Sequence, residues 1–491
     1  MRLVGPILHF RGQSENRWQL AAVVARQAEE DPGPLTLPSA PPVRAERLAV
    51  RQGHSFWRYD FSLPLLERET FVPYTVGGRA WRVHLPAAHG DRRMAYTACS
   101  GTDEEASDDR PVPASRNVLW RQLTATHARR PFHLVLHGGD QLYADSLWEA
   151  VPELGAWRAL PWKQANAHPF TPTMAEAAER FYFERYCWLW SQPDLAPILA
   201  EVPSLMMWDD HDIFDGWGSW PDDRQRCPVF QGLMGVAREH FALFQLAARA
   251  DRLPAGFADP RGGHFGWAVR AGGGVGIVAP DLRSERSRQR IMGEAGWRGF
   301  EAALEGLADC RHLLVMSSVP LANANLSAAE RVFVALPGHS DLEDDLRDQW
   351  QSFGHREEWR RMLRCLIDFG TRSGARVTSV SGEIHLGALG CIEGEGSVVH
   401  ELTSSGIVHE PPPALVTALY EWAARRPIRP APDLKVRLLE IPGHGRRYLR
   451  ARNWLALELG ADGRLEAAWH TERGEAGWLR LGAGLRSGET G

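Results

Sequence analysis

Short apolar runs alternate with longer amphipathic segments through the middle of the chain. The runs are brief, partly β-branched and continuously apolar, which is typical of strands that are buried on both faces. The predicted strands span 94–99, 132–137, 204–208, 274–280, 312–319 and 376–382, and helical patterns lie between them at 117–130, 174–190, 230–250, 341–350 and 357–374. Alternating strands and helices predict a layered α/β domain.

The two ends of the chain show other patterns. Within residues 1–88, short segments with a period of two are separated by proline, glycine and charged residues, which predicts an N-terminal β-sandwich. Residues 411–491 begin with a short helix after three prolines and continue as hairpin strands. We therefore expect three parts: the sandwich at 1–88, a central domain at 89–410, and an extension at 411–491 that packs on the central domain or completes a sheet edge.

Polar side chains follow the predicted strands of the central domain. The segments after five of these strands read CSGTDEE, GGDQLYAD, DDHDIFD, DLRSER and EIHLG. In layered α/β proteins the carboxyl ends of the strands open into the binding crevice. We therefore expect these side chains to converge on one site, although they lie far apart along the chain.

So many anionic groups in one place are unfavourable unless cations compensate for them. The donor set is rich in oxygen, with one imidazole and one thiol, which does not suit an all-cysteine structural zinc site. It suits hard cations, with one softer position where cysteine and tyrosine bind ferric iron or zinc. Taken singly, each residue is more often a core or capping residue, and only the set predicts a metal site. The candidate ligands are Cys99, Asp140, Tyr143, Asp210, Glu383 and His385.

Composition and charge narrow the classes of function. A chain of 491 residues exceeds one simple core, and its net charge of −5 argues against a nucleic-acid partner. None of the 6 cysteines forms a Cys-x-x-Cys pair, so a disulfide framework is not expected. The sequence shows no secretory pattern at its start and no run of about 18 apolar residues, which predicts a cytoplasmic protein without a membrane partner. The sequence does not indicate the oligomeric state.

Several motifs together resemble a known family. GGDQLYAD, WDDHDIFDGWG, DLRSER and SGEIHLG are similar to motifs of the alkaline phosphatase D, or PhoD-like, metallophosphatases, in the same order between about residues 90 and 410. The segment ELTSSGIVH at 401–409 also looks like a family segment, and VLWRQL resembles a cytoplasmic bacterial branch. The resemblance implies a four-layer α-β-β-α sandwich, of α/β (α+β) class, with metals at one edge and an N-terminal β-sandwich.

The resemblance also implies a chemistry and a ligand set. The family hydrolyses phosphomonoesters or phosphodiesters of small molecules, and its characterised kind uses Fe³⁺ with Ca²⁺; Zn²⁺ and Mn²⁺ are alternatives here. On the family pattern Cys99, Asp140 and Tyr143 surround the iron, and Asp140 bridges to the second cation. The calcium side is then held by Asp210, Glu383 and His385.

Two positions depart from the family pattern. The metallophosphatases generally have Asn-His where this chain has Asp210 and His211. They more often have Asp-Val-His where this chain has Glu383, Ile384 and His385. The longer glutamate keeps the charge but moves the carboxylate by about one methylene, which bears on metal identity and spacing.

The expected mechanism is in-line attack by a metal-activated hydroxide on the phosphate. His211 is expected to donate a proton to the leaving oxygen, and either Asp209 or Asp212 is expected to orient it. Arg283 or Arg286 is expected to hold the phosphate by paired hydrogen bonds. Surface ion pairs with glutamates 285 or 294 are an equally weighted alternative for these arginines.

Three other functions fit parts of the sequence. A non-catalytic metal-stabilised binding module would have the same ligands but no accessible water. A serine hydrolase would use Ser100 or Ser404, but the chain has no Gly-x-Ser-x-Gly elbow. A dinucleotide enzyme is weakly indicated, because the glycines of 271–276 enter a strand, whereas the Rossmann loop leaves one.

Overall fold

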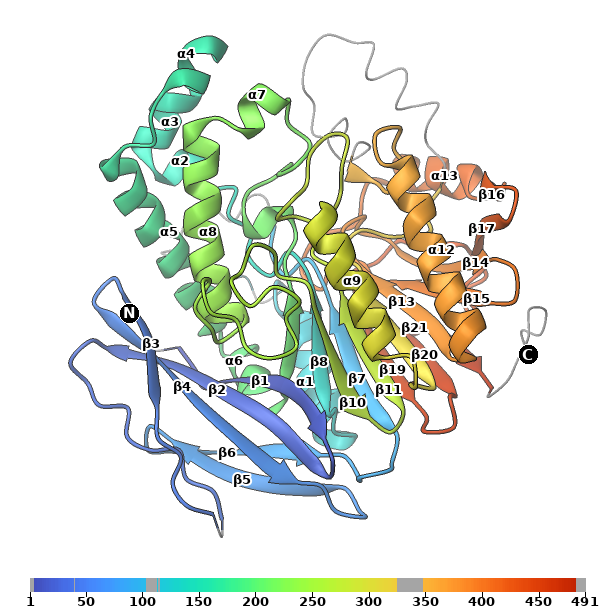
Figure 1. Ribbon diagram of the computed structural model, residues 1–491, viewed down its shortest axis with the longest axis horizontal. Helices are drawn as coiled ribbons and strands as arrows, with labels where there is room; N and C mark the ends of the chain where they lie inside the picture. The colour runs from blue at the N-terminus through green and yellow to red at the C-terminus, as the bar shows by residue number, and fades with distance from the viewer. Residues whose placement is uncertain (1–3, 39, 103–112, 114, 325–347, 483–491) are drawn as a thin grey trace.

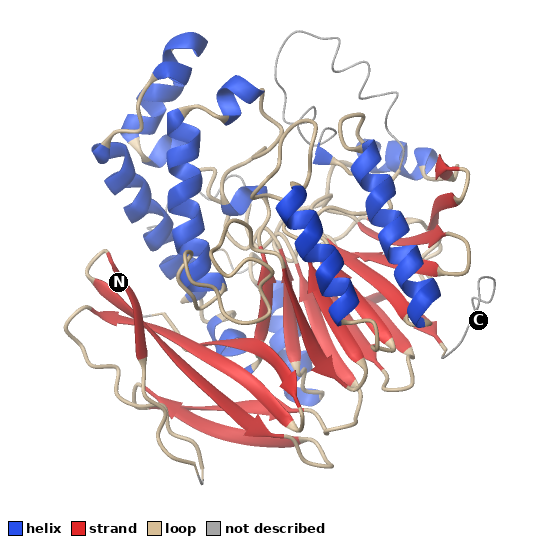
Figure 2. Cartoon of the chain, in the orientation of Figure 1, coloured by secondary structure: helices blue, strands red, loops and turns tan. Residues whose placement is uncertain are grey.

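Two large β-sheets pack face to face, and helices cover their outer faces (Figures 1 and 2). The computed structural model describes residues 4–38, 40–102, 113, 115–324 and 348–482. Leu136 and Met207 of one sheet share a buried cluster with Ile277 and Leu314 of the other, which places this core between the sheets. The four-layer α-β-β-α sandwich expected from the sequence is confirmed.

The first sheet has ten strands within the described ranges and mixes parallel with antiparallel pairs. Its central strands β7, β8 and β9 run parallel to one another, so their carboxyl ends lie at one edge. From edge to edge the strands are β21 (Gly474–Leu481), β20 (Leu465–Thr471), β19 (Asn453–Leu459), β7 (Arg92–Thr97), β8 (Leu134–Gly138), β9 (Ser204–Met207), β1 (Ile7–Ser14), β2 (Arg17–Gln27), β4 (His54–Pro64) and β3 (Glu46–Arg51).

The second sheet has nine strands in the part of the chain that is described. Strands β11, β12, β13 and β15 run parallel, so this sheet also has an edge where carboxyl ends collect. The order is β10 (Trp267–Gly272), β11 (Val275–Ala279), β12 (His312–Met316), β13 (Arg376–Ser381), β15 (Val398–Thr403), β14 (Gly387–Glu393), β17 (Leu434–Leu439) and β16 (Ile428–Ala431), with β18 (Tyr448–Leu449) paired to β14.

Helices with apolar faces cover both sheets. Trp120 of α1 (Val118–Arg129), Phe183 of α5 (Pro172–Trp190) and Phe244 of α8 (Pro228–Gln245) share a cluster with the first sheet. Helices α9 (Glu294–Gly306) and α12 (Arg356–Ser373) pack on the second sheet (Figure 1). The shorter helices are α2 (Leu147–Ala150), α3 (Pro152–Arg158), α4 (Trp162–Ala167), α6 (Ala196–Glu201), α7 (Asp222–Gln225), α13 (Ala414–Ala423) and a 3₁₀ turn at Asp210–Asp212.

The pattern-based elements of the central domain agree with the structure. All six predicted strands occur, as β7, β8, β9, β11, β12 and β13. Gly374 ends α12 in the left-handed region with φ of 70°, as expected for a C-terminal glycine cap. Of the helix expected at 341–350, residues 341–347 lie outside the described residues. Of the glycines in 271–276, Gly273 and Gly274 form the turn between the antiparallel strands β10 and β11, so this segment is not a dinucleotide loop.

Both end segments of the chain contribute strands to the large sheets. Strand β1 pairs with β9 in parallel at His9 and Ser204, so β1–β4 extend the first sheet. A separate ribbon of β5 (Thr70–Val76) and β6 (Arg79–Leu85) packs against it through Tyr74 and Val83. At the other end, β16 and β17 join the second sheet and β19–β21 join the first. The division at 1–88, 89–410 and 411–491 stays a prediction. Among the described helices, none has the length and apolar character that a membrane crossing requires.

Glu401 on β15 predicts a pH dependence of stability. Its side chain is fully buried, and burial raises its pKa to about 7, although Ser381 Oγ donates to Oε1 at 2.5 Å. Because the folded pKa lies above the unfolded one, its contribution is complete at low pH and is lost as the pH rises towards 7. We expect the unfolding free energy of the wild type to fall by up to ~3 kcal/mol over this pH range. That of Glu401→Gln should not show this fall, because glutamine does not ionise. Urea unfolding of both proteins across pH measures this difference, and parallel curves would contradict it.

Candidate metal centre

The carboxyl ends of the parallel strands bring the predicted ligands to one edge of the two sheets. Cys99 follows β7, Asp140 follows β8, and Glu383 follows β13 of the other sheet. Backbone hydrogen bonds join these loops: Cys99 N donates to Gly139 O at 3.2 Å, and Ser100 N donates to Asp140 O at 2.8 Å. The loop after β15 is joined in the same way, because His409 N donates to Cys99 O at 3.2 Å. Segments from both sheets therefore form one wall.

Four of the six predicted ligands have a left-handed backbone, which is uncommon for residues other than glycine. The φ angles are 51° at Cys99, 54° at Asp140, 63° at Glu383 and 53° at His385. Such conformations persist where the surroundings hold them, and they collect at functional sites. The backbone therefore marks these strand ends as special, independently of their side-chain chemistry.

The two glycines before Asp140 are each required, but for different physical reasons. Gly139 has φ of 109°, a conformation that side chains rarely adopt. Gly138 is required by close approach, because a Cβ there would meet the Tyr96 hydroxyl at 1.9 Å. The strand can therefore turn sharply and direct Asp140 into the site.

Asp140 carries a buried carboxylate that other charges surround. It is 1 % exposed, and its Oδ2 lies 3.6 Å from Cys99 Sγ. One oxygen of Asp140, one of Asp210 and one ring nitrogen of His211 lie within 4.8 Å of one another. Burial raises the pKa of Asp140 well above its usual value, and Asp209 raises it further. Its Oδ1 has no hydrogen-bond partner among the residues that the structure describes. This environment suits a carboxylate that binds a cation.

Asp212 holds the Asp140 loop in place. Its carboxylate accepts hydrogen bonds from the backbone N–H groups of Asp140 at 2.9 Å and Leu142 at 3.0 Å. It also accepts from Asp209 N at 3.0 Å and from Gln245 Nε2 at 2.8 Å. These bonds fasten the turn after β8 to the turn after β9, and they explain how the left-handed Asp140 is kept.

His211 is bonded to a carboxylate that the sequence interpretation did not choose. Its Nδ1 lies 2.8 Å from Asp145 Oδ2, whereas the Asp212 carboxylate accepts from Asp209 N and the Asp209 carboxylate accepts from Ser318 Oγ. Burial alone lowers the pKa of His211, but Asp145 and Asp210 outweigh it and hold that pKa well above the usual value. The role of Asp209 or Asp212 in orienting His211 stays a prediction, and the carboxylate that the structure places against the His211 ring is that of Asp145, the last residue of GGDQLYAD.

Aromatic rings stack beside the carboxylates. The Tyr143 ring lies 4.3 Å from that of His211, and the His385 ring lies 3.6 Å from that of His409. Tyr143 Oη lies 3.4 Å from His385 Nε2. Burial lowers the pKa of His385 well below its usual value, which favours the neutral imidazole that a metal ligand needs. The sequence interpretation missed His409, although it ends the segment 401–409 that carried part of the resemblance.

The Glu383 carboxylate, unlike the other predicted ligands, is bonded to a glutamine side chain. Gln349 Nε2 donates to its two carboxylate oxygens at 3.1 and 2.9 Å. Its carboxylate is not one of the atoms that gather around Asp140 within the described part of the chain. Burial raises the pKa of the Cys99 thiol. A hydrogen bond with the backbone of Glu383 lowers that pKa and partly opposes the rise. Glu383 therefore lies at the wall, and Gln349 holds its carboxylate there.

Arg283 and Arg286 are buried in a network of carboxylates. Arg283 is bonded to Asp209, to Asp210 at 3.2 Å and to Asp348 at 2.6 Å. Arg286 is bonded to Asp348 at 3.0 Å. The alternative of surface ion pairs is corrected, because both arginines are buried. The carboxylate at 285 instead accepts from two backbone N–H groups at 3.0 Å each. The predicted role of the two arginines in phosphate binding stays a prediction.

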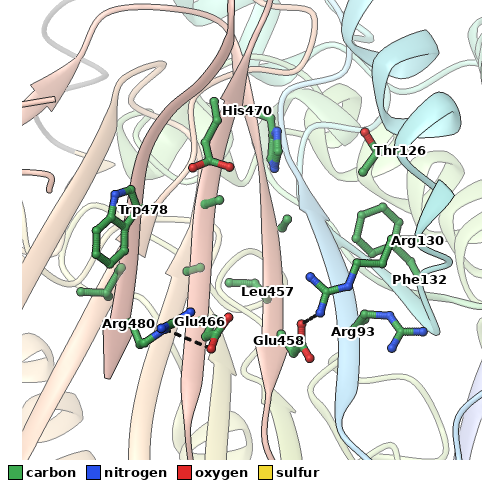
Figure 3. A pocket seen from close by; sticks show the side chains of 15 residues that line it. Arg93, Thr126, Arg130, Phe132, Leu457, Glu458, Glu466, His470, Trp478 and Arg480 are labelled. Carbon is green, nitrogen blue, oxygen red and sulfur yellow. Dashed lines mark hydrogen bonds and ion pairs between the residues drawn. The ribbon is translucent and has the colours of Figure 1, made fainter. Parts of the chain in front are cut away.

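A hollow of about 610 Å³ lies elsewhere, on the outer face of β19–β21 (Figure 3). Its wall carries the pairs Arg130–Glu458 and Arg480–Glu466, and none of the predicted site residues lines it. Arg93, which also lines it, is near the start of β7, whereas Cys99 follows the end of that strand. The hollow therefore lies away from the candidate metal centre, and the chemistry of its paired side chains does not suggest a reaction.

Solved structures with a similar fold agree with the four-layer arrangement. A structure described as that of PhoD has a TM-score of 0.56 at 13% identity, and covers 98% of this chain and 92% of that one. The purple acid phosphatase PPD1 from yellow lupin (Lupinus luteus) seeds has a TM-score of 0.52 at 11% identity, with 95% and 72% covered. At these identities the likeness concerns the fold.

Two sequence comparisons bear on the family to which the chain belongs. The Uncharacterized protein YGR266W of Saccharomyces cerevisiae is 26% identical over 400 residues, which are 68% of this chain and 56% of the relative. This chain thus matches little more than half of that relative's length. A family model described as PhoD related phosphatase matches residues 78–337, more than half of the chain, and includes the loops of Cys99, Asp140 and His211. The chain belongs to the PhoD related phosphatase family.

Proposed function

We propose that this chain is a metal-dependent phosphoesterase that hydrolyses phosphomonoesters, phosphodiesters or both. The observation that carries the proposal is the group formed by Asp140, Asp210 and His211, with a buried and unpartnered Asp140 oxygen among the described residues. Membership of a phosphatase family and the fold of two phosphatase structures support the same class of reaction.

The residues present fit metal ions. Cys99, Asp140 and Tyr143 would hold one ion, and Asp210, Glu383 and His385 would hold the other, with His409 beside them. A thiol and a phenol suit Fe³⁺ or Zn²⁺, and carboxylates suit Ca²⁺ or Mn²⁺. When bound, such ions polarise a phosphate oxygen and lower the pKa of water.

His211 supplies the proton in this proposal. Asp145 accepts from its Nδ1, which leaves Nε2 to donate to the oxygen of the departing group. The stacked ring of Tyr143 fixes the imidazole plane. Together Asp145 and Tyr143 restrict the rotation of His211, so the chain prepares the orientation of its proton donor before the substrate arrives.

The Arg283 network supports the same wall. Because Arg283 is bonded to Asp209 and Asp210, its positive charge offsets the repulsion between the two adjacent carboxylates. Ser318 Oγ donates to Asp209 Oδ1 at 2.7 Å, which links the turn after β9 to the second sheet. We assign Arg283 to positioning Asp210, and phosphate binding by Arg286 remains the prediction from the sequence.

The test combines metal content with turnover. The purified full chain is analysed for metals, stripped with a chelator, and reloaded with Fe, Ca, Mn and Zn singly and in pairs. Each form is assayed with p-nitrophenyl phosphate and bis-p-nitrophenyl phosphate. We expect bound metal and turnover that returns on reloading. Bound metal without turnover in every form would favour the non-catalytic binding module, and failure to bind any metal would reject both.

A further inference from the structure

Helix α13 presents apolar side chains to solvent. Leu415 is 82 % exposed, Leu419 is 49 % exposed and Trp422 is 61 % exposed. Their spacing of four and three residues places them on one face of the helix. Ala414 and Ala418 are exposed as well. An apolar stripe of this kind normally packs on a core, so its exposure indicates something that covers it.

The other side of α13 holds the helix to the protein through apolar packing as well as hydrogen bonds. Thr417 is buried, and the Tyr420 ring lies 5.7 Å from that of Tyr448. The Glu421 carboxylate accepts from Tyr448 N at 3.1 Å and from Arg447 N at 3.4 Å. The helix therefore cannot turn its leucines inward without breaking these bonds, and the outward stripe is part of the fold.

Five exposed arginines, called the rim below, follow α13 along the chain or lie on either side of β18, which contacts the helix. Arg425, Arg426, Arg429, Arg446 and Arg450 are exposed. None of them forms an ion pair with any other residue that the structure describes; Arg450 Nε donates to Pro412 O at 2.8 Å. The nearby glutamates 421 and 440 are both paired with Arg447. This rim is basic although the whole chain has a net charge of −5.

We propose that α13 docks the protein on an anionic lipid surface. A short helix with leucine and tryptophan on one face, flanked by arginine, lies in the plane of the headgroups and buries only its apolar side. The unpaired arginines then meet anionic headgroups, which is the charge complement of this rim. The sequence predicted no membrane partner because no segment spans a bilayer, and a helix that lies on the surface needs no such segment.

A second copy of the chain fits the stripe less well. A two-fold contact brings the same patch of both copies together, so the arginines of one rim would face those of the other. A stable dimer also buries about 800 Å² per partner, which a helix of ten residues with three large apolar side chains does not supply alone. The basic rim and the small stripe both favour the lipid surface.

The helix is close to the candidate metal centre along the chain. Its first residue, Ala414, is joined to His409 by Glu410 and the three prolines at 411–413. Five residues span at most about 18 Å, so docking holds the metal centre near the lipid surface. The docking proposal does not depend on the proposed function, because binding is measured without turnover.

The test is sedimentation of the full chain with vesicles of phosphatidylcholine alone or with added phosphatidylglycerol. We expect binding to the anionic vesicles that weakens with salt. Leu415→Asp with Leu419→Asp should lower the partition coefficient at least about tenfold. Arg425→Gln with Arg426→Gln should lower it about fivefold per arginine on anionic vesicles. Leu66→Asp, at a residue that is 54 % exposed on another surface, is the matched control and should bind like the wild type.

Measurements of the folding and the oligomeric state of each variant complete the test. Because the changed side chains are exposed, circular dichroism and the melting temperature should match the wild type. Light scattering reports the mass of each variant. Absence of binding by the folded wild type, or equal binding by the Leu415→Asp and Leu419→Asp variant, would overturn the proposal. A wild-type dimer that this variant converts to a monomer would overturn it too, because the stripe would then be an interface between copies.

Discussion

Asp140→Asn is expected to remove both the bound metal and the phosphoesterase activity, with a loss of at least about a thousandfold. Asp140 is a buried carboxylate whose Oδ2 lies 3.6 Å from Cys99 Sγ, and its Oδ1 has no partner among the described residues. Asparagine keeps the shape but loses the charge that would hold a cation. Metal analysis and assays with bis-p-nitrophenyl phosphate measure the two effects on one preparation.

The same variant has an expected effect on stability that separates this role from a structural one. Burial and Asp209 make the charge of Asp140 unfavourable in the metal-free protein. Asparagine removes that charge, so the metal-free variant should unfold at the same free energy as the metal-free wild type or a higher one. Asp433→Asn, in an exposed ion pair with Arg364, is the matched control and should keep metal and activity. Full activity in a folded Asp140→Asn protein would reject the ligand assignment.

Replacing His211 by asparagine should lower turnover by about a hundredfold to ten-thousandfold while the metal content stays near that of the wild type. The physical reason is the loss of the proton for the leaving oxygen. Substrates with a good leaving group need this proton least. The loss should therefore be smaller for p-nitrophenyl esters than for phenyl or alkyl esters, and a loss of equal size for all of them would contradict proton donation.

Asp145→Asn tests the orientation of His211 separately. The Asp145 carboxylate is bonded to His211 Nδ1 at 2.8 Å and also accepts from Asp215 N at 2.7 Å. The amide can still bond one of these groups but no longer stabilises a charged imidazole. We expect a loss of about 10- to 100-fold, with the same dependence on the leaving group as His211→Asn. A change in KM without a change in kcat would argue that Asp145 acts on substrate binding instead.

The sequence predicted the elements and the strand ends because these depend on local pattern. Continuous apolar runs placed all six central strands, and the direction of parallel strands then required Cys99 and Asp140 to meet. Gly374 marked the end of α12 for the same reason, since a left-handed cap favours glycine. Where the physics is local, a single sequence is sufficient.

Partners that depend on tertiary geometry were not predictable. Asp145 lies 66 residues from His211, and the adjacent Asp212 was the natural choice along the chain. Gln349 lies 34 residues from Glu383, and no local pattern indicates that pairing. Residues with carboxylates on both sides, such as Arg283, resemble surface residues in the sequence, and only the packing of two sheets shows that they are buried.

The order of strands in the first sheet has a consequence for how the protein folds during its synthesis. Strand β7, which leads to Cys99, lies between β8 and β19, and β19 is made more than 350 residues after β7. Strand β1 likewise finds its neighbour β9 only after residue 204 has left the ribosome. Pairings this distant form late and slowly. The wall around Asp140 therefore gains its second sheet only after β13 and β15 have been made, and the candidate metal centre is complete only once residue 409 has been synthesised.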